Sequence, residues 1–205
     1  MDAIEALTTR TSNGKLTDPA PDDETLSLAL GAATRAPDHG MLRPLRIHVI
    51  RGDARHKLGE LMAGVLARKT PGVSQEELDK MRNKALRAPM ILVVSAVVTD
   101  SPKVPALEQV LCAGAAATSI LLALHARGFG AIWRTGDVAY DREVKAAFGL
   151  AEKYALVGFI YTGTPKQPAP AIHRPRVADI VSEWRGSGRS DGGLASHLDI
   201  PSTTK

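Results

Sequence analysis

The 205-residue sequence contains one cysteine, Cys112, and its aromatic content is only 4%. A single thiol cannot form a disulfide within the chain, and none of the six histidines pairs with another at the four-residue spacing of a helical zinc site. We therefore predict no metal site. Apolar Leu111 and Ala113 flank Cys112, so we expect a small core residue. The alternative, a reactive thiol, needs a cationic and partly exposed setting.

The sequence also lacks a long unbroken apolar run. The longest stretch, residues 110–126, is interrupted by a glycine, two hydroxyl residues and a histidine. It falls short of the roughly 18 apolar residues that a membrane span needs. The first five residues carry two acids where a secretory signal has basic residues. We therefore expect a buried helix in this region and a cytoplasmic protein.

Familiar nucleotide and nucleophile motifs are missing as well. The sequence has no GxxxxGK[ST] loop and no GxSxG elbow. Gly128 and Gly130 could begin a dinucleotide fingerprint, but Trp133 stands where the third glycine would be. A Rossmann-type or P-loop nucleotide site is thus excluded.

Basic residues exceed acidic ones, with a net charge of +4 and a pI near 9.3. This balance leaves a nucleic-acid-associated protein open as an alternative. The basic residues are scattered among acids, however, and few aromatic residues are present to stack on bases.

What is present is a pattern of alternating helices and strands with 44% apolar residues, enough for one sizeable core. Residues 163–171 form a proline-rich arm, which we expect to lie extended over another surface, such as a second subunit. We predict one domain over residues 1–185 and a flexible Gly/Ser-rich tail over 186–205. The apolar spacing predicts helices over 2–10, 22–34, 53–67, 74–86, 105–127 and 141–148, and strands over 45–50, 89–98, 129–134 and 155–162, with 89–98 as the central strand.

Two predicted helices end in clusters that suit an anionic ligand. Arg10-Thr11-Ser12 follows the first helix, and Arg35-Ala36-Pro37-Asp38-His39 follows the second. Guanidinium groups match phosphate oxygens, and hydroxyls suit a polar tail. The alternative is that Arg10 and Arg35 only complement the negative end of a helix dipole.

These clusters, together with Gly130-Ala131-Ile132-Trp133-Arg134-Thr135-Gly136, resemble the nitroreductase family of flavin enzymes. The segment Val157 to Pro165 also matches the family's small single-domain subgroup. The resemblance implies an α+β, nitroreductase-like fold with a central, mostly antiparallel sheet of about four to five strands, flanked by helices, in a dimer.

By this resemblance the chain is an FMN-dependent NAD(P)H oxidoreductase that works by ping-pong hydride transfer to nitroaromatic or quinone-like acceptors. The protein would be a homodimer with FMN at the subunit interface. The flavin would carry the chemistry, so no side chain need be catalytic. The implied cofactor-binding residues are Arg10, Thr11 and Ser12 at the phosphate and ribityl end, Arg35 and His39 in the same site, and Ile132, Trp133 and Arg134 reaching the flavin of the partner chain.

Some positions depart from the family pattern. Thr11 and Gly14 stand where arginines are common, and Met41, Arg43 and Leu45 replace the usual Asn, Gln and Trp. Arg43 would make the pocket more cationic, which suits an anionic substrate. Arg174 resembles a C-terminal basic residue that touches the phosphate in relatives.

Flavin binding without turnover, as in a carrier or sensor, remains an alternative function. Trp133 has an alternative role as a core or interface anchor, and His39 as a loop histidine bonded to the backbone.

Overall fold

The computed structural model of the chain describes residues 1–169, 172–184 and 186. It divides the chain into two compact units, Met1–Ala169 and Pro170–Lys205. The described part of the second unit contains one short helix, α8 (Val177–Ile180). Apart from Gly186, the predicted tail over 186–205 lies outside the described residues.

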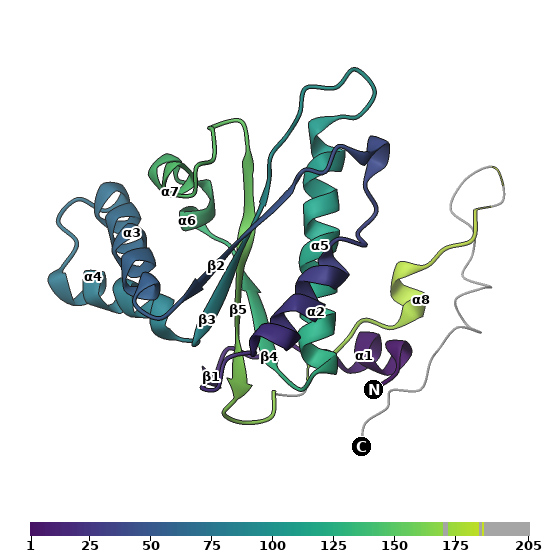
Figure 1. The fold of residues 1–205 in the computed structure, drawn as a ribbon, viewed down its shortest axis with the longest axis horizontal. Helices are drawn as coiled ribbons and strands as arrows, with labels where there is room; N and C mark the ends of the chain where they lie inside the picture. Colours follow the sequence, from purple (N-terminus) through teal and green to yellow (C-terminus); the bar gives the residue numbers. More distant parts are fainter. Residues whose placement is uncertain (170–171, 185, 187–205) are drawn as a thin grey trace. The chain divides into compact units, whose positions relative to one another are not determined.

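The first unit is built on a five-stranded antiparallel sheet (Figure 1). The strands lie in the order β1-β5-β3-β2, and β4 also pairs with β5. Their bounds are β1 (Leu16–Thr17), β2 (Leu45–Arg51), β3 (Met90–Ala96), β4 (Gly130–Arg134) and β5 (Ala155–Pro165). The predicted α+β class and the mostly antiparallel sheet are therefore confirmed.

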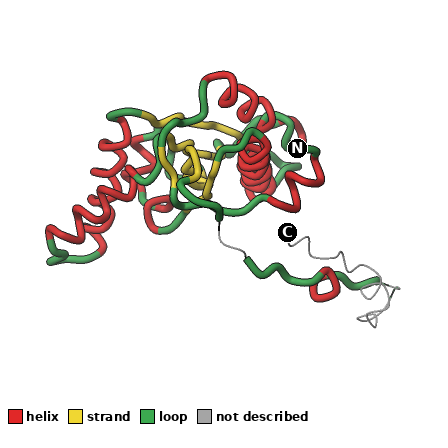
Figure 2. The backbone as a smooth tube through the Cα atoms, turned by 90° about the horizontal axis from the view of Figure 1, so that it is seen from below, coloured by secondary structure: helices red, strands yellow, loops and turns green. Residues whose placement is uncertain are grey.

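Helices cover both faces of this sheet, as the end-on view shows (Figure 2). One layer contains α2 (Asp23–Ala33) and the long α5 (Ala106–Ala126), which pack against each other. The opposite layer contains α3 (Ala54–Lys69), α4 (Gln75–Arg82), the 3₁₀ turn η2 (Asn83–Leu86), α6 (Asp137–Tyr140) and α7 (Arg142–Ala147).

Strand β3 shows why two layers form. Every residue of β3 is buried. Ile91 and Val93 join the core under α3, α6 and α7, whereas Leu92 and Val94 join the core under α2 and α5. Successive side chains of a strand point to opposite faces, so a continuous apolar strand needs cover on both sides.

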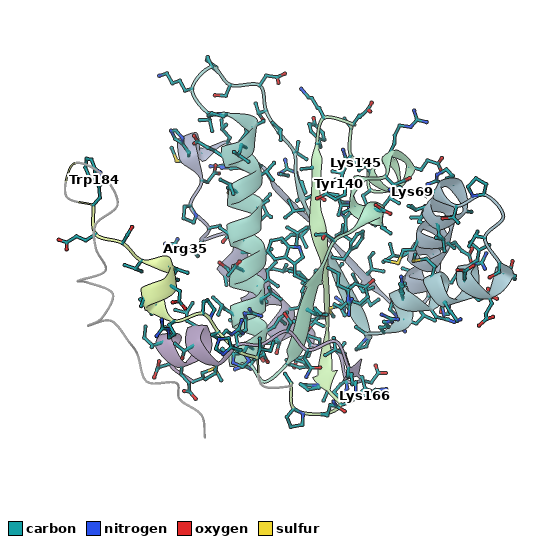
Figure 3. All side chains as sticks on the ribbon, turned by 180° about the vertical axis from the view of Figure 1, so that it is seen from behind. Arg35, Lys69, Tyr140, Lys145, Lys166 and Trp184 are labelled. Atoms are coloured by element: carbon teal, nitrogen blue, oxygen red, sulfur yellow. The ribbon has the colours of Figure 1, made fainter. Side chains whose placement is uncertain are left out.

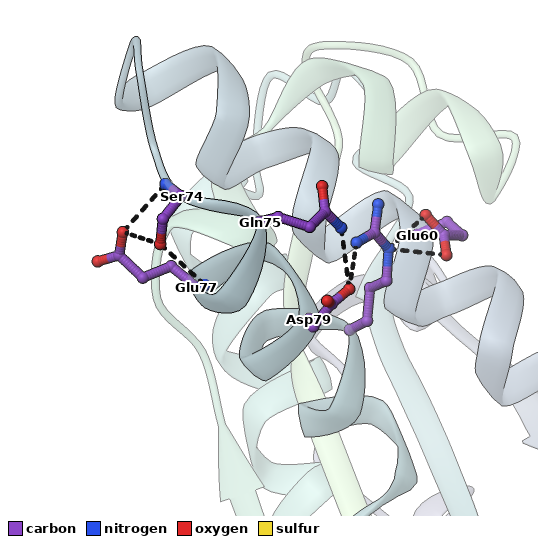
Figure 4. Close-up of polar contacts among 6 residues, drawn as sticks. Glu60, Ser74, Gln75, Glu77 and Asp79 are labelled. Carbon is purple, nitrogen blue, oxygen red and sulfur yellow. Dashed lines mark hydrogen bonds and ion pairs between the residues drawn. The ribbon is translucent and has the colours of Figure 1, made fainter.

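Four of the helices begin where side chains cap them. The carboxylates of Asp2, Asp22 and Asp141 accept backbone N–H bonds at the starts of α1 (Ala3–Thr9), α2 and α7. Ser74 and Glu77 form a reciprocal capping box at the start of α4 (Figure 4).

At the other end of α4, Arg82 ties the helix to α3. Its guanidinium donates to Glu60 at 2.9 Å and to Asp79 at 2.7 Å (Figure 4). The α3–α4 hairpin therefore holds one side of the second layer in place.

Three details of the sequence prediction need correction. The central strand is β5, which pairs with β1, β3 and β4, whereas β3 has two neighbours. Residues 163–165, expected in an extended arm, are the end of β5. The two-residue strand β1 and the η1 turn (His39–Met41) have no periodic signal and were not predicted.

Helix α5 is the one helix among the described residues that is long and apolar enough, by length and composition, to cross a membrane. Its Ala113, Ala116, Ala117 and Ile120 are fully buried against α2 and the sheet. The helix is therefore a core helix, as predicted. Cys112 is buried on it, which raises the pKa of its thiol and confirms its assignment as a core residue.

Candidate functional site

The residues after α1 run along the free edge of β4. The Asn13 N–H donates to the Ala131 carbonyl at 2.9 Å. A Cβ on Gly14 would lie 3.1 Å from Nη2 of Arg134 and 3.8 Å from Cδ1 of Ile132. The segment that follows Ser12 and the end of β4 are thus direct neighbours, although about 120 residues separate them in the sequence.

Arg10 and Thr11 lie beside the C-terminal end of α5, where they line a hollow of about 270 Å³ together with His125 and Gly130. We call it the α1–α5 hollow. Nε2 of His125 is 2.9 Å from the Thr9 hydroxyl. Burial lowers the pKa of His125, and the charge of Arg10 lowers it further. His125 is therefore neutral at pH 7.

On the other side of β4, a larger cavity of about 670 Å³ lies between the sheet and the α3–α4 layer. We call it the β4 cavity. Its floor is apolar and aromatic, formed by Ile132, Phe159 and Tyr161 of the sheet and by Met62 and Val65 of α3. Its volume falls in the range of small-molecule and cofactor pockets, about 300–1,000 Å³.

The rim of the β4 cavity is strongly cationic. Lys69, Lys84, Arg87 and Arg134 line it, and Asp137 is the one acid that does. Nζ of Lys69 pairs with the Asp137 carboxylate at 2.7 Å. Within the described ranges, the other three cations make no ion pair with an acid. The cavity thus combines flat apolar walls with uncompensated positive charge.

Tyr161 supplies a polar group at the base of this cavity. Its side chain is 3% exposed, and its hydroxyl donates only a weak bond to Sδ of Met62 at 4.0 Å. Burial raises the pKa of Tyr161 to about 12, while the charges of Arg134 and Arg87 act in the opposite direction. The hydroxyl therefore keeps its proton at neutral pH and can donate a hydrogen bond.

Trp133 points from β4 to the opposite face, toward α5. Its indole Nε1 donates to the Val157 carbonyl at 3.2 Å, and its ring lies 3.8 Å from where a Cβ of Gly114 would be. Trp133 also lines the β4 cavity. Its side chain is therefore a packing anchor on the α5 face, although the residue also borders the cavity.

Arg35 and His39 lie elsewhere in the protomer. Figure 3 shows Arg35 on the α5 side of the sheet and Lys69 on the other side. Nδ1 of His39 is 2.6 Å from the carboxylate of Glu108, at the start of α5. His125, beside Arg10, lies near the end of the same helix, roughly 26 Å away at about 1.5 Å of rise per residue.

The loop that carries His39 has a strained backbone. Met41 and Arg43 have φ angles of 52° and 51°, in the left-handed region that non-glycine residues seldom adopt. The Asp38 carboxylate holds the loop by accepting the backbone N–H of Leu42 at 3.2 Å and that of Arg43 at 2.7 Å. Met41 is 78% exposed at its tip. Strain of this kind is concentrated at ligand-binding and interface segments.

The structure thus brings Arg10, Thr11, Ser12, Ile132 and Arg134 to the two sides of the β4 edge. It does not bring Arg35 and His39 to them within one protomer. Lys84, Arg87 and Tyr161 also belong to the site, although the sequence does not predict them. The available signals were two basic residues just before a fully buried strand and one phenol in an otherwise apolar strand.

Comparison with known proteins places this geometry in a family. The chain matches the Nitroreductase family over residues 7–164. It is 40% identical over 184 residues to "Putative NAD(P)H nitroreductase YdjA" of Escherichia coli (strain K12), covering 89% of this chain and 99% of that protein.

Solved structures of nitroreductase-like proteins have a similar fold. The nitroreductase-like family protein from Bacillus cereus superposes with a TM-score of 0.77 at 21% identity, covering 91% of this chain and 97% of that one. A "putative nitroreductase" from Desulfovibrio desulfuricans, solved in complex with FMN, gives a TM-score of 0.66 at 25% identity and covers 88% and 95% of the two chains. The chain belongs to the nitroreductase family, as the resemblance in its sequence indicated.

Proposed function

We propose that the protein is an FMN-dependent NAD(P)H oxidoreductase, a cytoplasmic homodimer that reduces nitroaromatic or quinone-like acceptors. The observation that carries this proposal is the β4 cavity, an aromatic-floored pocket with a cationic rim beside the Arg10–Ser12 segment. The names of the curated relatives support the reductant, and the FMN complex of a structural relative supports the cofactor.

The residues present fit FMN. Its flat ring system needs apolar walls, which Ile132 and Phe159 provide, and donors for its pyrimidine edge. Lys84, Arg134 and the protonated Tyr161 hydroxyl are such donors. The hydroxyl of Ser12 and the guanidinium of Arg10, across the β4 edge, suit a phosphate and a ribityl chain.

FMN, when bound, accepts two electrons from NADH or NADPH and passes them to an acceptor. In the net reaction, a nitroarene, NAD(P)H and one proton give a nitrosoarene, NAD(P)⁺ and water. The chain's own residues bind and orient. Fixed cations at the cavity rim favour negative charge there without having to reorganise during the reaction.

Helix α5 supports the homodimer. Leu107 and Leu111 are 67% and 61% exposed and, with Thr118, lie on one face of the helix. Exposed Met41 lies at one end of this helix and exposed Leu7 of α1 at the other. A row of large apolar side chains that remains exposed in the protomer indicates a protein interface.

A two-fold axis across α5 would also complete the site. Antiparallel pairing of two α5 helices puts the end of one beside the start of the other. The Arg10–Ser12 segment would then lie near His39 of the partner subunit, and Arg35 would approach from the same side. This arrangement explains why the two clusters lie apart in one protomer.

The test is a visible spectrum with a reductant titration. We expect purified protein, or protein reconstituted with FMN, to show the oxidised-flavin bands. We expect NADH or NADPH to bleach them without oxygen, and a nitroarene or quinone to restore them. Folded protein that takes up no FMN contradicts the proposal. Bound FMN that neither reductant bleaches would instead indicate a carrier or sensor.

One substitution tests whether FMN binds in the β4 cavity. Arg134→Gln should weaken FMN binding by about 10-fold or more, because it removes a charged hydrogen-bond donor. The matched control is Arg142→Gln, an exposed arginine on α7 that does not line the cavity. Equal FMN affinity in the two variants would contradict the placement of FMN in the β4 cavity.

A further inference from the structure

The β4 cavity carries more positive charge than the proposed flavin needs. The flavin ring would carry one negative charge once reduced, and one adjacent cation would balance that charge. Lys84, Arg87 and Arg134 all line the cavity, and Lys69 adds a fourth cation that Asp137 already neutralises. Part of this charge is therefore available to a second ligand.

Arg87 is the cation most clearly placed for such a ligand. It follows η2 and precedes buried Ala88, whose carbonyl accepts a hydrogen bond from Nη1 of Arg55 at 2.9 Å. This bond anchors the backbone, while the Arg87 side chain lines the cavity and remains exposed. A fixed base and a solvent-accessible guanidinium suit an incoming substrate.

Arg87 and Arg134 act on the same point from two different elements. Both charges act on the hydroxyl of Tyr161, one from the η2 end and one from β4. Cζ of Arg134 lies 6.0 Å from the centre of the Tyr161 ring. Among the residues that the structure describes, no carboxylate contacts either guanidinium. Lys84, Arg134 and the Tyr161 hydroxyl face the proposed flavin, so Arg87 is, among the described residues, the unpaired cation of the cavity that remains for an anionic group.

The apolar walls of the cavity indicate what the uncharged part of the ligand must be. Met62, Val65 and Leu66, on the α3 side, present apolar surface to the cavity. A flat aromatic ring with an anionic substituent satisfies both parts, since the ring covers the apolar wall and the anion reaches the guanidinium. A neutral aromatic ring would gain less from Arg87, because it offers the guanidinium no opposite charge.

We propose that the β4 cavity selects aromatic electron acceptors that carry a carboxylate or a similar anion, and that Arg87 is the specificity-determining residue. This inference rests on the proposed function. The anion takes no part in the electron transfer. The nitro group takes up two electrons and two protons and loses one oxygen as water. NAD(P)H supplies both electrons and one proton, and solvent supplies the other proton.

The test compares 4-nitrobenzoate with neutral 4-nitrobenzamide in the FMN-loaded protein. The two compounds differ in intrinsic reactivity, so the readout is the ratio of their kcat/KM values in each variant. Arg87→Gln should lower the benzoate-to-benzamide ratio by about tenfold, as expected for loss of a charged hydrogen bond. Arg142→Gln, which removes the same charge outside the cavity, should leave the ratio unchanged.

Binding gives a second readout that needs no turnover. Unreactive benzoate should bind the parent protein more tightly than benzamide. Binding is followed by the fluorescence of bound FMN. Arg87→Gln should remove this preference, and added salt should weaken it. Thermal unfolding of the variants verifies that they are folded.

The outcomes separate the two proposals. If the FMN-loaded parent protein turns over neither nitro compound but still binds benzoate more tightly than benzamide, the proposed function is contradicted and the anion site is supported. Equal benzoate-to-benzamide ratios in Arg87→Gln and the parent overturn the inference. An Arg87→Gln effect on NADPH relative to NADH, with the benzoate ratio unchanged, also overturns it, because the anion is then the nucleotide phosphate.

Discussion

A methyl group added at Gly158 of β5 should damage both the sheet and the β4 cavity. The added Cβ would overlap Nε1 of Trp133 and would lie 2.8 Å from the backbone oxygen of Arg134. Both separations are far inside van der Waals contact, and one neighbour is backbone. Gly158→Ala must therefore displace the Trp133 indole and shift β4.

The cost has two parts. Overpacking a closed site costs about 1–3 kcal/mol. Loss of the bond from Trp133 to the Val157 carbonyl adds about 1 kcal/mol. The sum, about 2–4 kcal/mol, corresponds to a Tm lower by roughly 5–15 °C in a domain of this size.

The assay is thermal unfolding followed by circular dichroism and by tryptophan fluorescence. Gly31→Ala is the matched control, because Gly31 lies inside α2 with no atom within 4 Å of the added Cβ. That change should stabilise the protein by about 0.5–1 kcal/mol. A Tm of Gly158→Ala equal to that of the parent would refute the packing of Trp133 described above.

Three further outcomes are expected. His125→Gln should make the unfolding free energy less sensitive to acid. Burial and the charge of Arg10 hold the pKa of His125 below its ordinary value of 6.5, so the unfolded state binds more protons than the folded state. The stability of the parent protein therefore falls as the pH drops below 6.5. Identical pH profiles for variant and parent would argue against a partly buried, neutral His125. Leu111→Glu should give monomers in sedimentation, because it puts a charge on the exposed apolar face of α5; an unchanged dimer would place the interface elsewhere. Ser74→Ala should lower the unfolding free energy in urea by about 0.5–2 kcal/mol through loss of the α4 cap, and Ser27→Ala, on the exposed surface of α2, should not.

Most of the fold could be predicted because local signals and tertiary packing agree. The capping box at Ser74, the alternation along β2 and the apolar run of β3 each specify an element within a few residues of its observed bounds. Pairing was less predictable. Residues 163–165 look like a proline-rich arm, but they extend β5 because Gly163 allows close approach to Pro89 and to the Thr17 backbone.

The candidate site could be predicted only in part. Arg10 and Arg134 belong to motifs that stand out locally. Lys84 and Arg87 look like the solvated end of a polar helix, and only the packing of η2 against the sheet turns them into the wall of a cavity. No local pattern shows that β4 borders two separate hollows, because that follows from long-range strand pairing.

The most direct test of the account is a crystal structure of the protein loaded with FMN. We predict the flavin ring in the β4 cavity against Ile132 and Arg134, the phosphate beside Ser12, and His39 of the partner subunit at the same flavin. A flavin bound away from β4, or one enclosed by a single protomer, would contradict the central claim.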